Sequence, residues 1–306
     1  MRSLLSQISL HKLEVFCTVA ALGSVSRAAE RLGIAQPVVS GHLKTLAAKF
    51  GEPLTERQGR RVVLTETGRR VHLWAAEIVG RTREIEREMT ERRQGVGQAR
   101  LGASMTLGSY VLPGLIAAFH DTHPGCETSL RVAMPQSILD AIHGGECDFG
   151  FTILPPQQER WGLDIAFVRE EELILVASDR MSDPGASVDP HALGVIPFVG
   201  AQAGTPRREL EDALLAAQGV QRRRIVMEFG HAEALKQAVR AGAGAAFLFR
   251  NSVRDELASG ALREVATPGM TLRAPVYRVL RRGKRLSPFQ SELMEHLSGA
   301  MAGAAG

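Results

Sequence analysis

A helical pattern broken by a turn, in the stretch SVSRAAERLGIAQPVVSGHLKTL from Ser24 to Leu46, places the strongest constraint on how this chain folds. Its apolar residues have the spacing of two short amphipathic helices. Gly33 lies between these helices, and Pro37 opens the second of them. Proline suits the first turn of a helix because its missing N–H would have no partner there, and glycine permits a tight turn. The stretch therefore predicts two small helices joined by a sharp turn.

A further helix is expected before this pair, because Leu13, Phe16 and Val19 recur at helical spacing. Packing the three helices together leaves one face of the last helix open near its start. That face carries short polar groups and one small apolar residue: Gln36, Val38, Ser40, His42 and Lys44. Such side chains fit the major groove of DNA, whose base edges offer hydrogen-bond acceptors and the thymine methyl group. A generic three-helix packing motif is the alternative.

The charged residues are unevenly distributed along the chain. Residues 1–94 carry 16 Lys and Arg against 10 Asp and Glu, whereas residues 95–306 carry 21 against 23. A basic first third joined to a nearly neutral remainder indicates contact with a polyanion. Charge alone supports a solvated basic surface equally well.

A long helix is expected from about Glu66 to Arg93, with Thr65 as its N-cap. Its apolar residues recur every three or four positions among Arg and Glu, as in a coiled-coil seam: Val71, Trp74, Ile78, Thr82, Ile85 and Met89. This pattern predicts that two chains pair, which would place two recognition helices on the half-sites of one DNA site. Packing of the helix on its own domain is the alternative.

Beyond this helix, short β-like runs alternate with helical runs through turns marked by Gly and Pro. The alternation predicts a parallel α/β sheet. A second unit of the same kind follows, and the last strand and helix return to the sheet of the first. We therefore expect two lobes, lobe I over 95–167 and 273–303 and lobe II over 168–272, with crossovers near Phe167–Arg169 and Leu272–Ala274.

Several classes of protein find no support in the sequence. No run of about 18 apolar residues occurs, so neither a membrane span nor a membrane partner is expected. The three cysteines, Cys17, Cys126 and Cys147, stand far apart, and the N-terminus is too polar for a signal peptide, which together predict a reduced, cytoplasmic protein without a metal site. No Walker loop, dinucleotide fingerprint or nucleophile elbow is found, so no cofactor and no enzymatic activity are expected.

The segment from Phe16 to Gly68 resembles the winged helix-turn-helix of LysR-type transcriptional regulators. That family shows a small-residue pair before the turn, a Gln-x-x-x-Ser recognition helix, a Gly-x-x-Leu step and a Leu-Thr-x-x-Gly that closes the wing. These motifs fall on Ala28 and Ala29, on Gln36 and Ser40, on Gly51 and Leu54, and on Leu64, Thr65 and Gly68. Later segments, LP, HPG, GGECDFGF and AVRAGAG, match the ligand domain of the same family.

The resemblance implies the organisation of the whole chain. It implies a winged helix-turn-helix over residues 1–65, a linker and dimerisation helix over 66–94, and a ligand-sensing α/β domain over 95–306 that is similar to periplasmic solute-binding proteins. It also implies binding to double-stranded operator DNA, a homodimer that is commonly a dimer of dimers, and a small-molecule effector. A contact with RNA polymerase is left open.

The resemblance also assigns DNA contacts to individual residues. They are expected on the helix-turn-helix and on a basic wing, whose arginines would favour the narrow minor groove of A·T tracts. The residues are Ser26, Arg27, Gln36, Pro37, Val38, Ser40, His42, Lys44, Arg57, Arg60 and Arg61.

Four turns are expected to line the cleft between the lobes: GASMT, AMPQS, QAGTPR and FGH. Helix N-termini with Ser and Thr hydroxyls favour a small anion, although each hydroxyl taken singly could simply cap its helix. The candidate residues are Ser104, Met105, Thr106, Pro135, Gln136, Gly204, Thr205, Arg207, Gly230 and His231. This domain most nearly resembles the regulators that serve carbon fixation and sulfur assimilation, although only part of their Gly-Ser-Gly-Thr-Arg loop is kept.

Three functions can be weighed against these features of the sequence. A ligand-responsive transcription factor agrees with both halves of the chain. A solute-binding or transport protein is opposed by the basic N-terminal third. An enzyme with a helical appendage has no catalytic motif in its favour.

Overall fold

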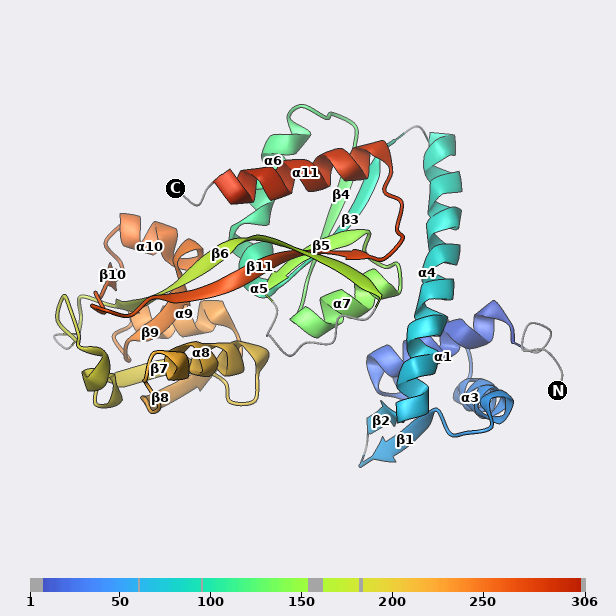
Figure 1. The fold of residues 1–306 in the computed structure, drawn as a ribbon, viewed down its shortest axis with the longest axis horizontal. Coiled ribbons are helices and arrows are strands. Elements are labelled where there is room, and N and C mark those ends of the chain that lie inside the picture. The colour runs from blue at the N-terminus through green and yellow to red at the C-terminus, as the bar shows by residue number, and fades with distance from the viewer. Residues whose placement is uncertain (1–7, 60, 95, 154–161, 182–183, 304–306) are drawn as a thin grey trace.

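A small helical domain is joined by one long helix to a larger, two-lobed α/β domain in the computed structural model (Figure 1). The structure describes residues 8–59, 61–94, 96–153, 162–181 and 184–303. This is the fold class that the sequence predicts. Across the described ranges, no helix combines the length and the apolar character that crossing a membrane requires.

The N-terminal domain consists of three helices and a two-stranded wing. Its elements are α1 (Leu10–Leu22), α2 (Val25–Leu32), α3 (Gln36–Phe50), β1 (Thr55–Gln58) and β2 (Arg61–Leu64), with β1 and β2 antiparallel. The apolar stripe expected on α1 is buried, with Phe16 and Val19 both 0% exposed. Val39 and Leu46 of α3 are equally buried, so α3 presents its other face outward.

The long helix α4 (Glu66–Gln94) begins where the sequence predicts. The Thr65 Oγ1 accepts a hydrogen bond from the Gly68 N–H at 2.9 Å, which confirms Thr65 as the cap. The first half of α4 packs on its own domain, because Val71 and Val79 join the core formed by α1 and α3. Farther along, Ile85 and Met89 are 55% and 54% exposed. Trp74 in the first half is also 41% exposed, so the predicted seam is open to another chain at Trp74 and along its second half.

One seven-stranded sheet runs through both lobes. Its strands are β3 (Gln98–Ala103), β4 (Glu127–Val132), β5 (Phe149–Ile153), β6 (Leu163–Ala177), β9 (Ala246–Phe249), β10 (Arg263–Glu264) and β11 (Leu272–Arg281). Their order is β10-β6-β11-β5-β3-β4, and β9 also pairs with β6. The prediction of a parallel sheet is correct for β3 with β4 and β5, but wrong for the other pairs, which are antiparallel. The reason is that the chain leaves lobe I along β6 and returns beside it along β11.

Helices cover the sheet on both faces in lobe I. There α6 (Leu112–His120) and α11 (Pro288–Gly303) lie on one face and α7 (Pro135–His143) on the other, while the short α5 (Met105–Tyr110) follows β3 (Figure 1). Lobe II adds a parallel pair of strands and several helices: β7 (Pro197–Ala201), β8 (Arg224–Phe229), α8 (Pro206–Ala217), α9 (Ala232–Arg240), α10 (Arg254–Ala258) and the 3₁₀ turns η2 (Pro190–Gly194) and η3 (Arg250–Val253).

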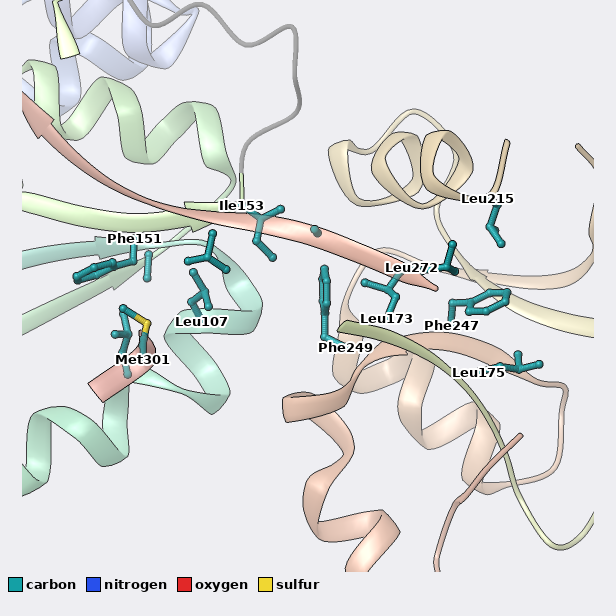
Figure 2. Packing of buried hydrophobic residues seen from close by; sticks show 14 of the residues in the cluster. Leu107, Phe151, Ile153, Leu173, Leu175, Leu215, Phe247, Phe249, Leu272 and Met301 are labelled. Atoms are coloured by element: carbon teal, nitrogen blue, oxygen red, sulfur yellow. The ribbon is translucent and has the colours of Figure 1, made fainter. Parts of the chain in front are cut away.

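The two lobes meet along β6 and β11, and the core continues across the meeting point. A bulge interrupts the β6–β11 register between Val276 and Tyr277, opposite Arg169 and Phe167. Figure 2 shows the buried side chains on both sides of this point, with Ile153 and Phe249 between the two groups. The connection between the lobes is therefore a packed double strand.

A buried ion pair lies beside the bulge. The Arg169 Nη2 donates to the Glu171 Oε2 at 2.6 Å, and both side chains are at most 6% exposed. The Arg169 Nη1 also donates to the Met301 carbonyl of α11, while the Asn251 side chain in η3 donates to Glu171. This network links the last helix of lobe I to lobe II through the crossover strand.

Ion pairs also fasten α4 to lobe I. Glu84 of α4 accepts from Arg281 at 2.5 Å and lies 3.1 Å from the Lys284 Nζ. Lys284 in turn contacts Asp148 at 3.2 Å. The side chains of Arg281, Lys284 and Asp148 are only 3–4% exposed. These four residues form a buried charge cluster between α4 and lobe I.

A second group of charges reaches the helix-turn-helix itself. Glu146 of lobe I lies 3.6 Å from Arg31 of α2 and 3.8 Å from Arg83 of α4. Arg83 also pairs with Glu14 of α1 at 3.1 Å. The N-terminal domain, the linker helix and lobe I are thus joined around one carboxylate.

Candidate DNA interface and effector cleft

Local hydrogen bonds fix the turn between α2 and α3. The Ser24 Oγ caps α2 by accepting from the Arg27 N–H at 3.3 Å. At the other end of α2, Gly33 takes the left-handed backbone, with φ of +65°, that the sharp turn requires. The Ser26 hydroxyl donates to the Gln36 Oε1 at 3.2 Å, which ties the start of α2 to the start of α3.

Most of the predicted DNA-contacting residues on these helices are open to solvent. Ser26, Arg27, Gln36, Pro37, Val38 and Lys44 are exposed, while Ser40 and His42 are half-buried. The His42 ring packs edge-on against His11. Ala35 at the N-cap of α3 provides no side-chain acceptor. Pro37 has no N–H, and the Val38 N–H donates to the Ala35 carbonyl at 2.9 Å, so the first turn of α3 offers a phosphate at most the Gln36 N–H.

The wing is anchored to the helices beneath it. The Val62 N–H donates to the Gly23 carbonyl at 2.9 Å, and the Thr65 N–H donates to the Leu54 carbonyl at 3.2 Å. A Cβ at Gly68 would lie 1.8 Å from that Leu54 oxygen, which explains the glycine of the Leu-Thr-x-x-Gly motif. Arg57 and Arg61 are exposed on the two wing strands. Arg60 lies outside the described residues.

A cavity of about 110 Å³ lies between the lobes. Lobe I contributes Ser104, Met105, Thr106, Met134, Pro135 and Ile153, and lobe II contributes Ala201, Thr205, Pro206, Arg207, Leu210, Phe229, Gly230, His231, Ala232, Leu235, Leu248 and Phe249. We call this cavity the effector cleft. Gly204 and Gln136, expected at the cleft, are not among the described residues that line it. The Gln136 side chain donates to Asp140 at 2.8 Å and lines a separate groove of about 620 Å³ between lobe I and the N-terminal domain.

Most of the cleft wall is apolar, and nothing in the sequence assigns these residues to a binding site. Ile153, Leu248 and Phe249 belong to strands whose apolar runs indicate a core. Leu210 and Leu235 lie on the inner faces of α8 and α9. In the sequence, these residues could be linked to the cleft only through their strands and helices, which adjoin the turns predicted to line it.

Arg207 is the cationic side chain of the cleft wall. Its Nη2 donates to the Phe247 carbonyl at 2.8 Å, and its guanidinium lies 4.6 Å from the centroid of the Phe249 ring. Glu211 is 3.6 Å away but also pairs with Arg223. Burial lowers the pKa of Arg207. Its Nε faces the Glu211 Oε2 at 3.6 Å, so this carboxylate offsets part of the charge that Arg207 presents to the cleft.

The hydroxyl groups of the cleft differ in their availability. The Thr205 Oγ1 donates to the Gln202 carbonyl at 2.7 Å and caps α8, so it is occupied. The Ser104 Oγ accepts from the Ile153 N–H at 3.5 Å. The buried Thr106 hydroxyl, by contrast, finds no partner among the described residues. His231 caps α9, because its Nδ1 accepts from the Glu233 N–H at 3.2 Å.

A hydrogen bond crosses from one lobe to the other near the cleft. The Tyr110 hydroxyl at the end of α5 donates to the Glu233 Oε2 of α9 at 2.8 Å. Burial and this hydrogen bond raise the pKa of Tyr110 to about 12. Lys236 pairs with Glu233 at 3.0 Å and with Glu256 at 2.9 Å. The lobes are thus held together by polar contacts at this edge of the cleft.

Comparison with known families matches both parts of the chain. Residues 10–69 match the bacterial regulatory helix-turn-helix protein of the lysR family, and residues 92–302 match the LysR substrate binding domain. The HTH-type transcriptional regulator YeiE of Escherichia coli K12, itself uncharacterized, is 32% identical over 285 residues, which are 92% of this chain and 94% of that protein.

A second relative is named for a metabolic operon. The RuBisCO operon transcriptional regulator of Allochromatium vinosum is 32% identical over 283 residues, 92% of each chain. This relative confirms the resemblance to the carbon-fixation branch.

Solved structures share the fold. A full-length variant of OxyR from Pseudomonas aeruginosa superposes with a TM-score of 0.65 at 21% identity, covering 96% of this chain and 94% of that one. The regulatory domain of Synechocystis CcmR, solved in complex with 2-PG, gives a TM-score of 0.59 at 24% identity over 67% of this chain and 97% of its own.

The family consists of transcriptional regulators and not of enzymes, and its members bind operator DNA, respond to small-molecule effectors and form oligomers. An exposed helix-turn-helix, a long linker helix and a cleft between two α/β lobes are the parts that such a protein needs. The chain belongs to the LysR family and is a transcriptional regulator with a DNA-binding domain and an effector-binding domain.

Proposed function

We propose that this regulator acts in the cytoplasm, reads its operator with the exposed start of α3, and responds to a small anion bound at Arg207 between the lobes. The observation that carries the proposal is the placement of Arg207 on the wall of a cavity lined by both lobes. A ligand there contacts both lobes at once, so its binding energy favours the arrangement in which both sets of contacts are made. CcmR, whose regulatory domain has the same fold, holds the small anion 2-PG.

The anion site is tested by removing the charge of Arg207. The substitution Arg207→Met keeps much of the length of the side chain, and it is expected to weaken anion binding about 10- to 100-fold, because hydrogen bonds to a charged group contribute about 1.5–3 kcal/mol. Calorimetry on the full chain with a panel of small carboxylates and phosphates measures the loss.

Arg208→Met is the matched control for this test. Arg208 is the next residue of α8, but it pairs with Asp212 and Glu228 and does not line the cleft. Anion binding should survive in this variant. Equal binding by wild type and Arg207→Met would exclude Arg207 from the site.

Base readout is tested at Gln36. The substitution Gln36→Ala should relax sequence preference at one position of each half-site and cost about 1–3 kcal/mol of binding free energy. Binding titrations against a set of operators with single-base changes measure both effects. Arg61→Ala on the wing should instead weaken binding to all sequences alike and reduce its salt dependence. A Gln36→Ala protein with unchanged sequence preference would contradict the proposed orientation of α3.

We further propose that the exposed second half of α4 pairs with a second copy of the chain. Ile85→Asp would place an unpaired carboxylate in a desolvated seam, so smaller species and weaker operator binding are expected in analytical ultracentrifugation and DNA titrations. Glu77→Asp, at an exposed position of the first half of α4, is the control. An unchanged mass for Ile85→Asp at low protein concentration would show that other surfaces hold the oligomer.

A further inference from the structure

The effector cleft combines one positive charge with an apolar wall, and this combination restricts the chemistry of its ligand. Arg207 is the only Lys or Arg among the described residues that line it. His231 also lines the cleft, with its Nδ1 accepting from the Glu233 N–H. The Glu211 carboxylate, 3.6 Å from Arg207, offsets part of the positive charge of Arg207. The lining side chains therefore offer compensation for at most one negative charge.

The other cations near the cleft are already paired. Arg208 contacts Asp212 and Glu228, and Arg223 contacts Glu211 and Asp212. Lys236, on the inner side of α9, is held by Glu233, Glu256 and the Ser252 carbonyl. A dianion in the cleft would leave one charge without a counterpart among these side chains, and burying an unpaired charge is costly.

The remainder of the wall favours a hydrocarbon. Met105, Met134, Ile153, Leu210, Leu235, Leu248 and Phe249 all line the cleft. Its volume of about 110 Å³ is somewhat less than that of a cavity known to hold benzene, about 150 Å³. A body of about four to six carbons is the size that this comparison indicates.

We infer that the effector is a monocarboxylate with an apolar body, its carboxylate on Arg207 and the Thr106 hydroxyl and its hydrocarbon against the leucines and Phe249. This inference rests on the proposed function, since it takes the cleft to be the effector site. It deepens that proposal by excluding dicarboxylates and phosphate esters as the preferred class.

The test uses pairs of acids that differ in charge but not in carbon number. Calorimetry on the full-length protein compares butyrate with succinate and hexanoate with adipate, and includes inorganic phosphate and phosphoglycolate as phosphate-bearing probes. We expect each monocarboxylate to bind at least about tenfold more tightly than its dicarboxylate partner. From acetate to hexanoate, affinity should rise about fourfold for each methylene, as burial of a CH₂ group implies. Arg207→Met should weaken the monocarboxylate binding about 10- to 100-fold, and Arg208→Met should preserve it.

The outcomes separate the inference from the proposal beneath it. Tighter binding of dicarboxylates or phosphates that Arg207→Met abolishes would overturn the monocarboxylate inference and leave the anion site standing. Affinity that does not depend on chain length would overturn the apolar part of the inference. Failure of every probe of both charge classes to bind would overturn the inference and the anion site together.

Discussion

Asp148→Ala is expected to lower the free energy of unfolding by about 3–5 kcal/mol, the usual cost of removing one partner from a buried ion pair. The Asp148 side chain is 3% exposed and contacts Lys284, whose own side chain is 4% exposed. Its other oxygen accepts from the Arg100 N–H at 2.9 Å, so a backbone donor also loses its partner. Urea denaturation followed by circular dichroism measures the loss.

Asp164→Ala provides the matched control for Asp148→Ala. Asp164 also faces an arginine of the same region, Arg282, at 3.5 Å, but the two side chains are 58% and 70% exposed. Exposed pairs contribute at most about 1 kcal/mol. If the two variants were equally stable, the charge cluster under α4 would not contribute as its burial implies.

Glu171→Ala should destabilise the protein by a similar amount, about 3–5 kcal/mol, and should also alter the relation between the lobes. Arg169 would be left buried beside the bulge with only the Met301 carbonyl as an acceptor among the described residues. Because Asn251 of η3 would lose its contact too, the link from lobe I to lobe II is broken at the crossover. Thermal unfolding and small-angle X-ray scattering measure the two effects.

The double variant Arg169→Leu with Glu171→Leu tests whether the ion pair stabilises the fold or only offsets the cost of burying its two charges. Replacing both charges with apolar side chains removes the desolvation cost of each, so much of the stability lost in Glu171→Ala should return. A double variant as unstable as the single one would show that the hydrogen bonds to Met301 and Asn251 matter more than the pair itself.

Local signals in the sequence predict the N-terminal domain well. Gly33, Pro37 and Thr65 each act within a few residues of themselves, as a turn former, a helix opener and a cap. The apolar spacing of α1 and α3 depends only on the helical period. Because all these signals are local, helix positions and the exposed face of α3 follow from the sequence.

Features that depend on distant parts of the chain could not be predicted in the same way. The antiparallel pairing of β6 with β11 joins segments that are far apart in the sequence. The sequence of neither strand indicates whether it runs parallel or antiparallel to its neighbour. Likewise, the apolar run of β9 has the same composition whether Phe249 is buried in a core or lines a cleft. Thr205 was predicted to face the ligand, but its hydroxyl is occupied by capping α8. A threonine at the start of a helix can serve either role, and the sequence does not distinguish them.

The contacts around Glu146 have a geometric consequence for signalling. Ion pairs join α2, α4 and lobe I there, and further ion pairs join α4 to lobe I at the charge cluster under α4. If these contacts persist when a ligand closes the cleft, we expect lobe II to change its orientation relative to lobe I, with the helix-turn-helix staying beside lobe I. The signal would then pass from the surface of lobe II to a neighbouring copy of the chain.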